Sequence, residues 1–552
     1  MKKRFLLGTL FSCTVLLAAC GGGDQTTDST GTEGNASNSE QVFNVAVPQE
    51  MPSADLSIAR DTISFTALNN VYEGLYRLDA DNKPIPAGAA EMAEISEDGL
   101  TYTFHLREDA VWSNGEPVTA DDYVTGWQRT VDPKTASEYA YLYAPVANAE
   151  KITAGEADVS ELGIEAVSDY ELKVTLDVAT PYFDYLLAFP SFFPQNKAIV
   201  EEKGDNYAQT SDDAIYNGPF VLTGFDGPGV DTEWGYEKND DYWDAENVKL
   251  EQINVTVVKE SATGLNLFQD GALDDVTLSG ELAQQNASNP DYVVDKESRT
   301  SYLALNQEAS DSPFRNINLR KAISYAIDRE SMVKQVLGDG SVASTTIIPE
   351  GMSFDPDNNK DFVEEAAADL SYDPEKAKEY WEKAKSELGI DSLEVEFLAD
   401  DTDSVRAVSQ YVQGALQETL DGFTVKLSVV PISVRLDRQQ QEDYDIVMGG
   451  WGADYADPST FLDLFTTEKS TGRGKWSNAE YDALMKEAAT TNATDPSARW
   501  KNMLDAEKIL MDDMGVVPVY QRASGHLRAE KIQDVVVHGA GASYDYKWAS
   551  VK

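Results

Sequence analysis

The clearest repeat of apolar and polar positions lies in the second half of the chain. Apolar residues recur at helical spacing between 319 and 327, directly after Asn318. The pair Asp373-Pro374 carries the start signals of a further helix, and Gly389 carries its stop signal. Both segments are therefore predicted to be amphipathic helices that bury one face.

Strand-like alternation appears between these helical segments. Strands are expected at 393–397, 425–429 and 445–448, with a helix over about 404–420 and a shorter helix before the third strand. Strands that alternate with helices predict α/β units and a largely parallel sheet.

The first half of the chain has shorter patterns. Alternation over 43–47 predicts a strand, and so does alternation through Tyr102, Phe104 and Leu106. The segment 112–115 is typical of a turn, and Thr119 with Asp122 three residues later predicts the start of a helix.

One segment stands out by its position after a predicted strand. In parallel sheets, ligands bind outside the carboxyl ends of strands, and the strand 445–448 is followed by Gly-Gly-Trp-Gly-Ala-Asp-Tyr. The glycines predict a supple loop that a ligand can approach closely, while Asp454 can pair with a ligand ammonium. In the alternative interpretation, Asp454 caps or turns the chain and Trp451 fills the core.

The start of the chain indicates export. A basic start, Lys2-Lys3-Arg4, precedes a largely apolar run that ends in Leu-Ala-Ala-Cys at 17–20. This pattern predicts a signal peptide over 1–19. Residues 20–41 are rich in small polar residues and predict a flexible tether. Cys20 at the mature start is similar to the bacterial lipobox cysteine, whose thiol is acylated; the alternative is an ordinary export signal with an accidental cysteine.

Length and charge narrow the class of protein. The 552 residues suggest roughly three domains, and a formal charge of −52 disfavours nucleic acid and anionic lipid as partners. The chain has two cysteines, Cys13 within the predicted signal and Cys20, so we expect neither a disulfide nor a thiol metal site. With three histidines, a zinc enzyme is not expected, and we predict no cofactor and no metal.

Two short motifs of other protein classes are rejected. Ser331 and Lys334 fit the Ser-x-x-Lys pattern of penicillin-binding enzymes, but the companion motifs are missing, so Ser331 is interpreted as part of a helix. The segment from Asp355 begins like a calcium loop, yet Lys360 occupies its obligatory glycine position. A glycosidase carboxylate pair is not excluded among 96 acidic residues.

Many ordered motifs together resemble a known family. They are Asn-Val-Tyr-Glu-Gly-Leu at 70–75, Thr-Phe-His-Leu-Arg at 103–107, Trp-Ser-Asn-Gly-Glu-Pro-Val-Thr-Ala-Asp-Asp at 112–122, Trp-Gln-Arg at 127–129, Asp-Pro-Lys-Thr-Ala-Ser at 132–137, Tyr-Trp at 242–243, Leu-Arg-Lys-Ala at 319–322, Trp-Gly-Ala-Asp-Tyr at 451–455 and Val-Pro-Val-Tyr at 517–520. From Val42 to Lys552 the chain resembles the oligopeptide-binding lipoproteins of bacterial ABC importers, the extracytoplasmic solute-binding family 5. Trp-x-Ala-Asp-Tyr favours the peptide-binding branch over nickel or sugar binders.

The resemblance implies a fold and a division into domains. It implies a two-lobed periplasmic-binding-protein-like α/β fold with hinge strands and an extra α/β domain. Lobe I would combine 42–72, 198–305 and 521–552, the extra domain 73–197, and lobe II 306–520. Such a protein captures oligopeptides between its lobes and delivers them to ABC permease subunits, while partner ATPases spend the ATP.

The same resemblance implies site residues. Asp454 would pair with the peptide ammonium, and backbone beside Trp451, at Gly450 and Gly452, would hydrogen-bond the peptide. Tyr139 would touch the ligand. A well-known relative has an Arg, which helps hold ligand carboxylates, where this chain has Met448. Arg522, Arg435 and Arg438 are the candidates to replace it.

The resemblance also implies surroundings and leaves alternatives. We expect a non-enzymatic, lipid-anchored monomer on the outer face of the cytoplasmic membrane, typical of a Gram-positive cell surface. A receptor lipoprotein selective for one signalling peptide is the first alternative. A surface peptidase or glycosidase is the second, and it would need a positioned nucleophile or acid pair.

Overall fold

The computed structural model describes residues 41–366 and 368–552. The predicted signal peptide, Cys20 and all of the predicted tether except Gln41 lie outside the described residues. Among the helices that are described, none combines the length and the apolar composition that crossing a membrane requires.

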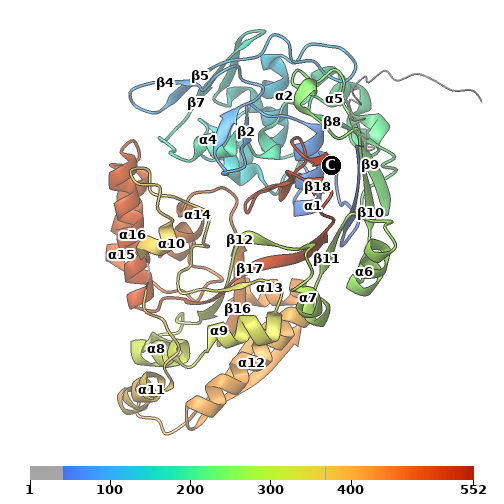
Figure 1. The fold of residues 1–552 in the computed structure, drawn as a ribbon. Helices are drawn as coiled ribbons and strands as arrows, with labels where there is room; N and C mark the ends of the chain where they lie inside the picture. The colour runs from blue at the N-terminus through green and yellow to red at the C-terminus, as the bar shows by residue number, and fades with distance from the viewer. Residues whose placement is uncertain (1–40, 367) are drawn as a thin grey trace, which may run out of the picture. The chain divides into compact units, whose positions relative to one another are not determined.

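An 11-stranded mixed sheet forms the centre of the fold (Figure 1). Its main path runs in the order β15 (Phe423–Val430), β14 (Leu393–Asp400), β16 (Ile446–Gly452), β12 (Tyr292–Leu305), β17 (Val517–Arg528), β11 (Asp275–Leu278), β1 (Val42–Val47), β10 (Gln252–Val257), β9 (Glu233–Lys238) and β8 (Phe220–Thr223), and β13 (Val342–Ala343) pairs with β17.

The prediction of a largely parallel sheet is wrong for the sheet as a whole. The pairs β14–β15 and β14–β16 are parallel, as the alternating strands and helices predicted, and the pairs β1–β10 and β1–β11 in the first half of the chain are parallel as well. The long strands β12 and β17 pair antiparallel with each other, and β12 is also antiparallel to β16. Both strands come from segments in which the sequence shows no strand–helix–strand unit, so local periodicity did not reveal them.

Smaller sheets carry the remaining strands. The four-stranded sheet has the order β4 (Glu94–Ile95), β5 (Thr101–His105), β7 (Glu171–Thr175) and β6 (Ile164–Ser168), and the two-stranded sheets pair β2 (Tyr76–Leu78) with β3 (Pro84–Pro86), β18 (Ile532–Gln533) with β21 (Ser550–Val551), and β19 (Val536–Val537) with β20 (Tyr544–Asp545).

The α-helices of the described residues are α1 (Thr62–Val71), α2 (Ala120–Val131), α3 (Ala149–Thr153), α4 (Phe183–Leu186), α5 (Lys197–Lys203), α6 (Ser261–Gln269), α7 (Gly280–Asn286), α8 (Ile317–Tyr325), α9 (Arg329–Met332), α10 (Phe362–Ala366), α11 (Pro374–Leu388), α12 (Asp403–Thr419), α13 (Ile432–Gln440), α14 (Ser459–Leu462), α15 (Ala479–Ala489) and α16 (Pro496–Asp512). The predicted helices correspond to α2, α8, α11, α12 and α13, and the helix expected at Ser331 corresponds to α9. The sequence analysis did not predict the others.

Helix caps account for several of these boundaries. Asp373 caps α11 through its side chain, and Gly389 ends the helix in the left-handed region at a φ of 69°. In α2, the Thr119 amide donates to Asp122 Oδ2 at 2.9 Å, as the capping pattern predicted. Helix α8 begins slightly earlier than its apolar stripe, because the Asn316 side chain caps it by accepting from the Leu319 amide.

Two large clusters of buried apolar side chains hold the described residues together. One collects residues between 43 and 255 and between 532 and 551, so the first part of the chain shares its core with the C-terminal segment. The other collects residues between 302 and 520. Strands β12 and β17, which lie side by side in Figure 1, contribute buried residues to the second cluster, and the other end of β17 pairs with β11.

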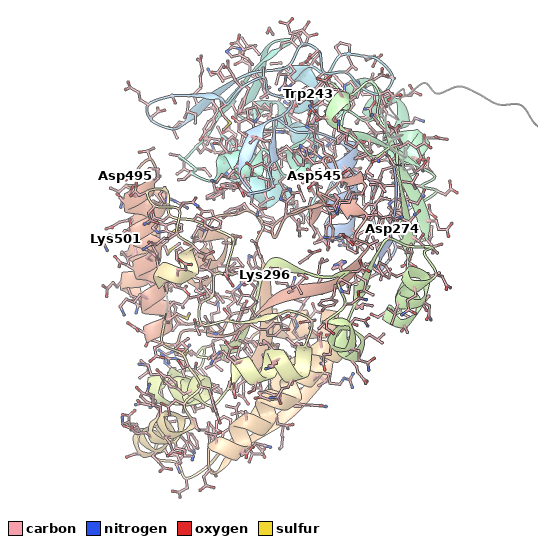
Figure 2. The ribbon with its side chains drawn as sticks, in the orientation of Figure 1. Trp243, Asp274, Lys296, Asp495, Lys501 and Asp545 are labelled. Carbon is pink, nitrogen blue, oxygen red and sulfur yellow. The ribbon has the colours of Figure 1, made fainter. Side chains whose placement is uncertain are left out.

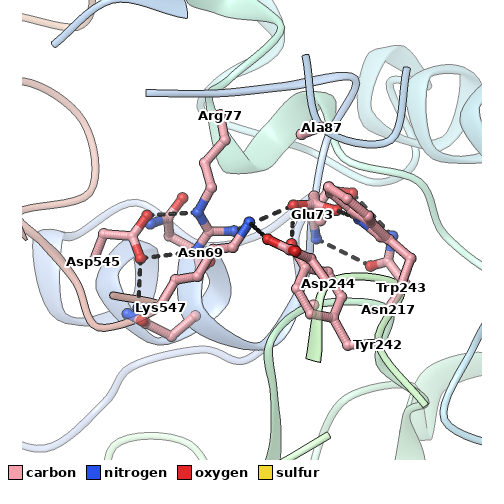
Figure 3. A network of polar contacts seen from close by, with 12 residues as sticks. Asn69, Glu73, Arg77, Ala87, Asn217, Tyr242, Trp243, Asp244, Asp545 and Lys547 are labelled. Carbon is pink, nitrogen blue, oxygen red and sulfur yellow. Dashed lines mark hydrogen bonds and ion pairs between the residues drawn. The ribbon is translucent and has the colours of Figure 1, made fainter. Parts of the chain in front are cut away.

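A buried ionic network ties the C-terminal segment to α1 and β2 (Figure 3). Arg77 donates to Asp545 through two nitrogen atoms, at 2.6 and 2.9 Å, and its Nη1 lies 3.8 Å from Glu73. Glu73 also accepts from the Trp243 indole at 2.6 Å, and Lys547 pairs with Asp244 at 2.8 Å.

Candidate functional site

Asp454 lies just after β16, half-buried beside residues of the first cluster. Burial raises the pKa of its carboxyl to about 6, while a hydrogen bond from the Tyr141 side chain acts in the opposite direction. Among the described residues no backbone amide donates a hydrogen bond to this carboxylate, so Asp454 does not act as a helix cap. A carboxylate that is dehydrated without a cation partner is suited to receive one from a ligand.

Two tyrosines face Asp454 from a distant part of the chain. Tyr139 precedes a short 3-10 helix, Ala140–Tyr143, on which Tyr141 lies. Burial, and next the negative charge of Asp454, raise the pKa of Tyr139, which places the two side chains in electrostatic contact. Tyr139 stacks on Phe189 with ring centroids 5.5 Å apart and meets Phe65 edge-on at 5.0 Å.

The structure thus brings together two residues that the resemblance singled out, Asp454 and Tyr139. It adds Tyr141, which the sequence analysis missed. The only sequence signal for Tyr141 is the alternation of tyrosines at 139, 141 and 143, and such spacing does not distinguish a buried ring from an exposed one. Tyr143 is fully buried, whereas Tyr141 is 52% exposed.

A small cavity of about 20 Å³ adjoins Asp454. Its wall includes Phe189, Asn69 and His538. The neighbouring Tyr455 stacks face to face on Tyr182, with ring centroids 4.1 Å apart. This stacking holds the chain after Asp454 against the segment that contains α4.

The glycines near Trp451 lie in a strand, so the prediction of a supple loop over 449–452 is wrong. β16 continues to Gly452 because β12 supplies an antiparallel partner along its whole length, from Leu305 opposite Ile446 to Arg299 opposite Gly452. Pairing with β14 on the other side covers Ile446 and Val447. Beyond Val447, β16 therefore has a free edge within the described part of the chain.

The hydrogen bonds between β12 and β16 show which way the backbone N–H and C=O groups of β16 point. The Asp445 carbonyl accepts from Asn306 and the Ala453 amide donates to Ser298, so odd-numbered residues of this stretch point toward β12. Because successive residues alternate, the backbone groups of Gly450 and Gly452 point away from β12, toward the free edge. These are the two glycines expected to hydrogen-bond a peptide.

The three glycines differ in what surrounds them. A methyl group at Gly449 would lie 2.8 Å from the ring of Tyr302, so the fold itself requires glycine there. At Gly450 and Gly452 the nearest atoms would be 3.5 and 3.7 Å away, which is ordinary contact distance. Packing within the protein does not explain these two glycines, whereas close approach of a ligand backbone does.

Trp451 is only partly accounted for by core packing. It packs against the edge of the second cluster, and the Arg473 guanidinium lies 5.3 Å from its ring centroid. Its indole nitrogen is 3.5 Å from Thr460 Oγ1, too long for a strong hydrogen bond. The ring stays half-buried, which leaves part of it open to a ligand.

A larger cavity of about 480 Å³ lies along β12 and β17. Arg522 lines it, with Nε 3.2 Å from Glu297 Oε1. Arg438 pairs with Glu396 and Asp443 and does not line this cavity.

Other candidate chemistry remains structural. Ser331 lies in α9, where its amide donates to the capping Asp328 side chain. The Asp355 carboxylate accepts from the amides of Asp357 and Asn358 within a turn. Across residues 41–366 and 368–552, no group of three or more His, Cys, Asp or Glu side chains is arranged to hold a metal ion.

Sequence comparison places the chain among known transport proteins. The family model described as bacterial extracellular solute-binding proteins, family 5 Middle, matches residues 83–473. The chain is similar to the dipeptide-binding protein of Lactococcus lactis subsp. cremoris (strain MG1363), at 38% identity over 566 residues with 100% of both chains covered. It is 33% identical to the oligopeptide-binding protein OppA of Bacillus subtilis (strain 168), with 99% of both chains covered.

Solved structures show the same likeness. The structure of Listeria monocytogenes OppA bound to peptide matches with a TM-score of 0.75 at 46% identity, covering 93% of this chain and 99% of that one. The structure of the pheromone receptor PrgZ matches with a TM-score of 0.76 at 39% identity, covering 93% of this chain and 100% of that one.

Proposed function

This chain belongs to the bacterial extracellular solute-binding proteins of family 5, and we propose that it captures oligopeptides outside the cytoplasmic membrane and delivers them to an ABC importer. The observation that carries this proposal is the half-buried Asp454 carboxylate, which has no cation partner among the described residues and lies beside a free strand edge. The ammonium of a peptide would supply the missing charge, and its backbone would extend β16.

Backbone recognition suits a transporter of many peptides. Hydrogen bonds from Gly450 and Gly452 reach groups that every peptide carries, so they add affinity without selecting side chains. The tyrosines near Asp454 offer apolar surface to the first residue of the ligand. No step in this mechanism breaks a bond, so we propose that the protein is not an enzyme.

The proposed organisation has two lobes joined by β12 and β17. Lobe I is assigned to 42–72, 198–305 and 521–552, the extra domain to 73–197 and lobe II to 306–520. The cluster of buried residues between 302 and 520 supports one lobe, and the cluster that joins 43–255 to 532–551 supports the composite nature of the other. The extra domain shares the first cluster, which joins 43–255 to 532–551, so we expect it to unfold together with lobe I.

The proposal includes an anchor. Cys20 would be acylated and hold a monomer on the outer face of the membrane, next to the permease, with the ATPases on the cytoplasmic side. Two acyl chains bind a membrane stably where one does so only marginally. Expression of Cys20→Ala with labelled palmitate tests the anchor, and label that persists in the variant would contradict it.

The experiment that tests peptide capture is recovery of the native ligand. Protein purified without denaturation is expected to carry peptides, which mass spectrometry identifies after acid release. A mixture of unrelated sequences supports nutrient uptake. Purified protein that carries no peptide would overturn the proposal if it also gave no heat of binding in calorimetry with any member of a peptide library.

A second function is favoured by one comparison. The likeness to the pheromone receptor PrgZ raises the alternative of a receptor for one signalling peptide. The two functions differ in selectivity, because a receptor binds one sequence far more tightly than its scrambled version. Calorimetry with recovered peptides and their scrambled versions distinguishes them. Incubation with labelled peptide distinguishes both from a surface peptidase, which alone would release fragments.

A further inference from the structure

The positively charged side chains that line the larger cavity differ in whether a carboxylate pairs with them. Lys259 pairs with Glu50 at 2.6 Å, Lys296 with Glu350 at 3.0 Å and Arg522 with Glu297 at 3.2 Å. Figure 2 labels Lys296, which lies on β12. Arg299 also lines this cavity, and within the described residues no carboxylate pairs with it.

Arg299 also lies next to the part of β16 that has the free edge. It is directly opposite Gly452, so the two residues share one face of the sheet. A methyl group on Gly450 would lie 3.8 Å from Arg299 Nη2, and one on Gly452 would lie 3.7 Å from Nη1. Its guanidinium is therefore held over the two glycines whose backbone groups face the free edge.

A second guanidinium reinforces the positive charge. Arg435 is buried, and its Nε has no hydrogen-bond partner among the described residues. Its nearest carboxylate is Asp400, at 3.8 Å. Burial lowers the pKa of Arg435, the Asp400 carboxylate and Tyr302 act in the opposite direction, and the positive charge of Arg299 makes a smaller lowering contribution, so the two guanidinium groups are within electrostatic range of each other. An anion between them would relieve the repulsion between their positive charges.

We propose that Arg299, supported by Arg435, binds the carboxylate of the ligand. It would take the place of the arginine that a well-known relative has at the position of Met448. This inference rests on the proposed peptide-binding function. The anion could be the terminal carboxylate of a short peptide or an acidic side chain of a longer one, since both present the same two oxygens to a guanidinium fork.

The position of Arg299 sets an expected peptide length. Asp454 is two residues beyond Gly452 and four beyond Gly450. At roughly 3.3 Å per fully extended residue, these separations are at most ~7 and ~13 Å, because β16 ends at Gly452 and the chain bends at Asp454. An extended peptide of about two to four residues spans the same distance, so its two charged ends would meet Asp454 and Arg299 together.

The test compares free-acid and C-terminally amidated peptides of two, three, four and six alanine-type residues by calorimetry. Wild type is expected to bind the acid of the short peptides at least about tenfold more tightly than the amide. Arg299→Gln should bind both forms equally, and Arg299→Lys should keep part of the preference, because it retains charge without the planar fork. Lys296→Gln, at an ion-paired cation of the same cavity, should keep all of it.

Each outcome bears on one claim. Loss of the acid preference in Arg299→Gln, with binding of the amide intact, supports the assignment. Equal binding of acid and amide by wild type, or an unchanged preference in Arg299→Gln, overturns it, while continued discrimination against N-acetylated peptides would leave the proposed function standing. A preference confined to hexapeptides that carry an internal Glu would assign the anion to a side chain and overturn the short-peptide length. If Arg299→Gln does not fold, the wild-type and Arg299→Lys measurements decide alone.

Discussion

At the scale of single residues, Asp454 combines two opposing properties. An unpaired, dehydrated carboxylate lowers the stability of the ligand-free protein, and the same dehydration strengthens its attraction to a ligand ammonium. Function and stability therefore pull in opposite directions at this one side chain. The two predictions at this scale separate these effects.

Asp454→Asn is expected to weaken binding of peptides with a free amino terminus. Loss of one partner of a desolvated charge pair costs about 2–5 kcal/mol, because the other charge stays buried and unpaired. Wild type should discriminate against N-acetylated peptides, and the variant should lose most of that discrimination. The −52 charge of the chain attracts cations in general, and salt screens this attraction. Calorimetry at low and at high salt therefore separates it from the contact with Asp454. Equal affinity of wild type for free and acetylated peptide at every salt concentration would falsify the role of Asp454.

The pH dependence of peptide affinity should follow the same carboxyl. Its pKa is raised to about 6, so affinity should increase between about pH 4.5 and 7 as Asp454 ionises, and fall again above about pH 8 as the peptide amine loses its proton. Tyr141→Phe removes a hydrogen bond that lowers this pKa, and should move the acidic limb to higher pH. Stability has the opposite sign: because the carboxyl pKa is raised from its ordinary value near 4 to about 6, the ligand-free protein loses stability as the pH rises from about 4 through 6, and no more above that range.

The control for this profile is the ligand-free Asp454→Asn protein. Because it has no carboxylate to dehydrate, its melting temperature at pH 8 should exceed that of wild type. A lower melting temperature for Asp454→Asn at pH 8, or an acidic limb that is unchanged in this variant, would contradict the assignment.

At the scale of elements, β16 acts as a strand with two different edges. One edge is saturated by β12, and the other is free beyond Val447. Free edges are normally blocked by charge, proline or a covering segment. Here glycines keep the edge flat and open, which suits addition of a ligand strand.

Three glycine substitutions in β16 should separate folding from binding. Gly449→Ala places a methyl group 2.8 Å from the buried Tyr302 ring and should lower the free energy of unfolding by about 1–3 kcal/mol. Gly450→Ala and Gly452→Ala meet no protein atom closer than 3.5 Å and should leave stability within about 1 kcal/mol of wild type. Both should nevertheless weaken peptide binding. Urea unfolding and calorimetry on the same samples measure the two effects; full affinity in both outer variants would exclude backbone docking at this edge.

At the scale of the whole molecule, the C-terminal segment closes the first core. Asp545 is fully buried and accepts two bonds from Arg77, and the Arg77 charge keeps its pKa low although burial alone would raise it. A lowered carboxyl pKa contributes stability that is present above the unfolded value and lost on acidification. The network of Figure 3 therefore links chain segments far apart in sequence, and this link depends on pH.

Arg77→Met should destabilise the protein by about 3–5 kcal/mol, because it leaves Glu73 and Asp545 buried without their cation. Lys501→Met removes an exposed ion pair within α16 and should change stability by less than about 1 kcal/mol. Chemical unfolding at pH 7 compares the two. If the variants were equally stable, the network would have no role beyond that of a surface pair.

Ligand binding should also change the whole molecule. Two lobes that share a ligand usually close on it about a few hinge residues, here expected in β12 and β17. Peptide should therefore reduce the radius of gyration in solution scattering. It should also change tryptophan emission, since Trp451 lies beside the free edge of β16. A peptide that binds with unchanged scattering would argue against closure, and free amino acids serve as the control.

Local sequence determined the elements that have clear apolar spacing and caps, and the tertiary structure decided the site. The bounds of α2, α11 and α12 follow from apolar spacing and caps, which act over a few residues and are visible in the sequence. The free edge of β16 depends on β12, about 150 residues earlier in the chain, and no local pattern encodes that pairing. Asp454 was recognisable from its motif, whereas Tyr141 and Arg299 were not, because each matters only through a neighbour that folding brings beside it. Long-range pairing thus converted a glycine-rich stretch, predicted as a loop, into a strand with one open edge.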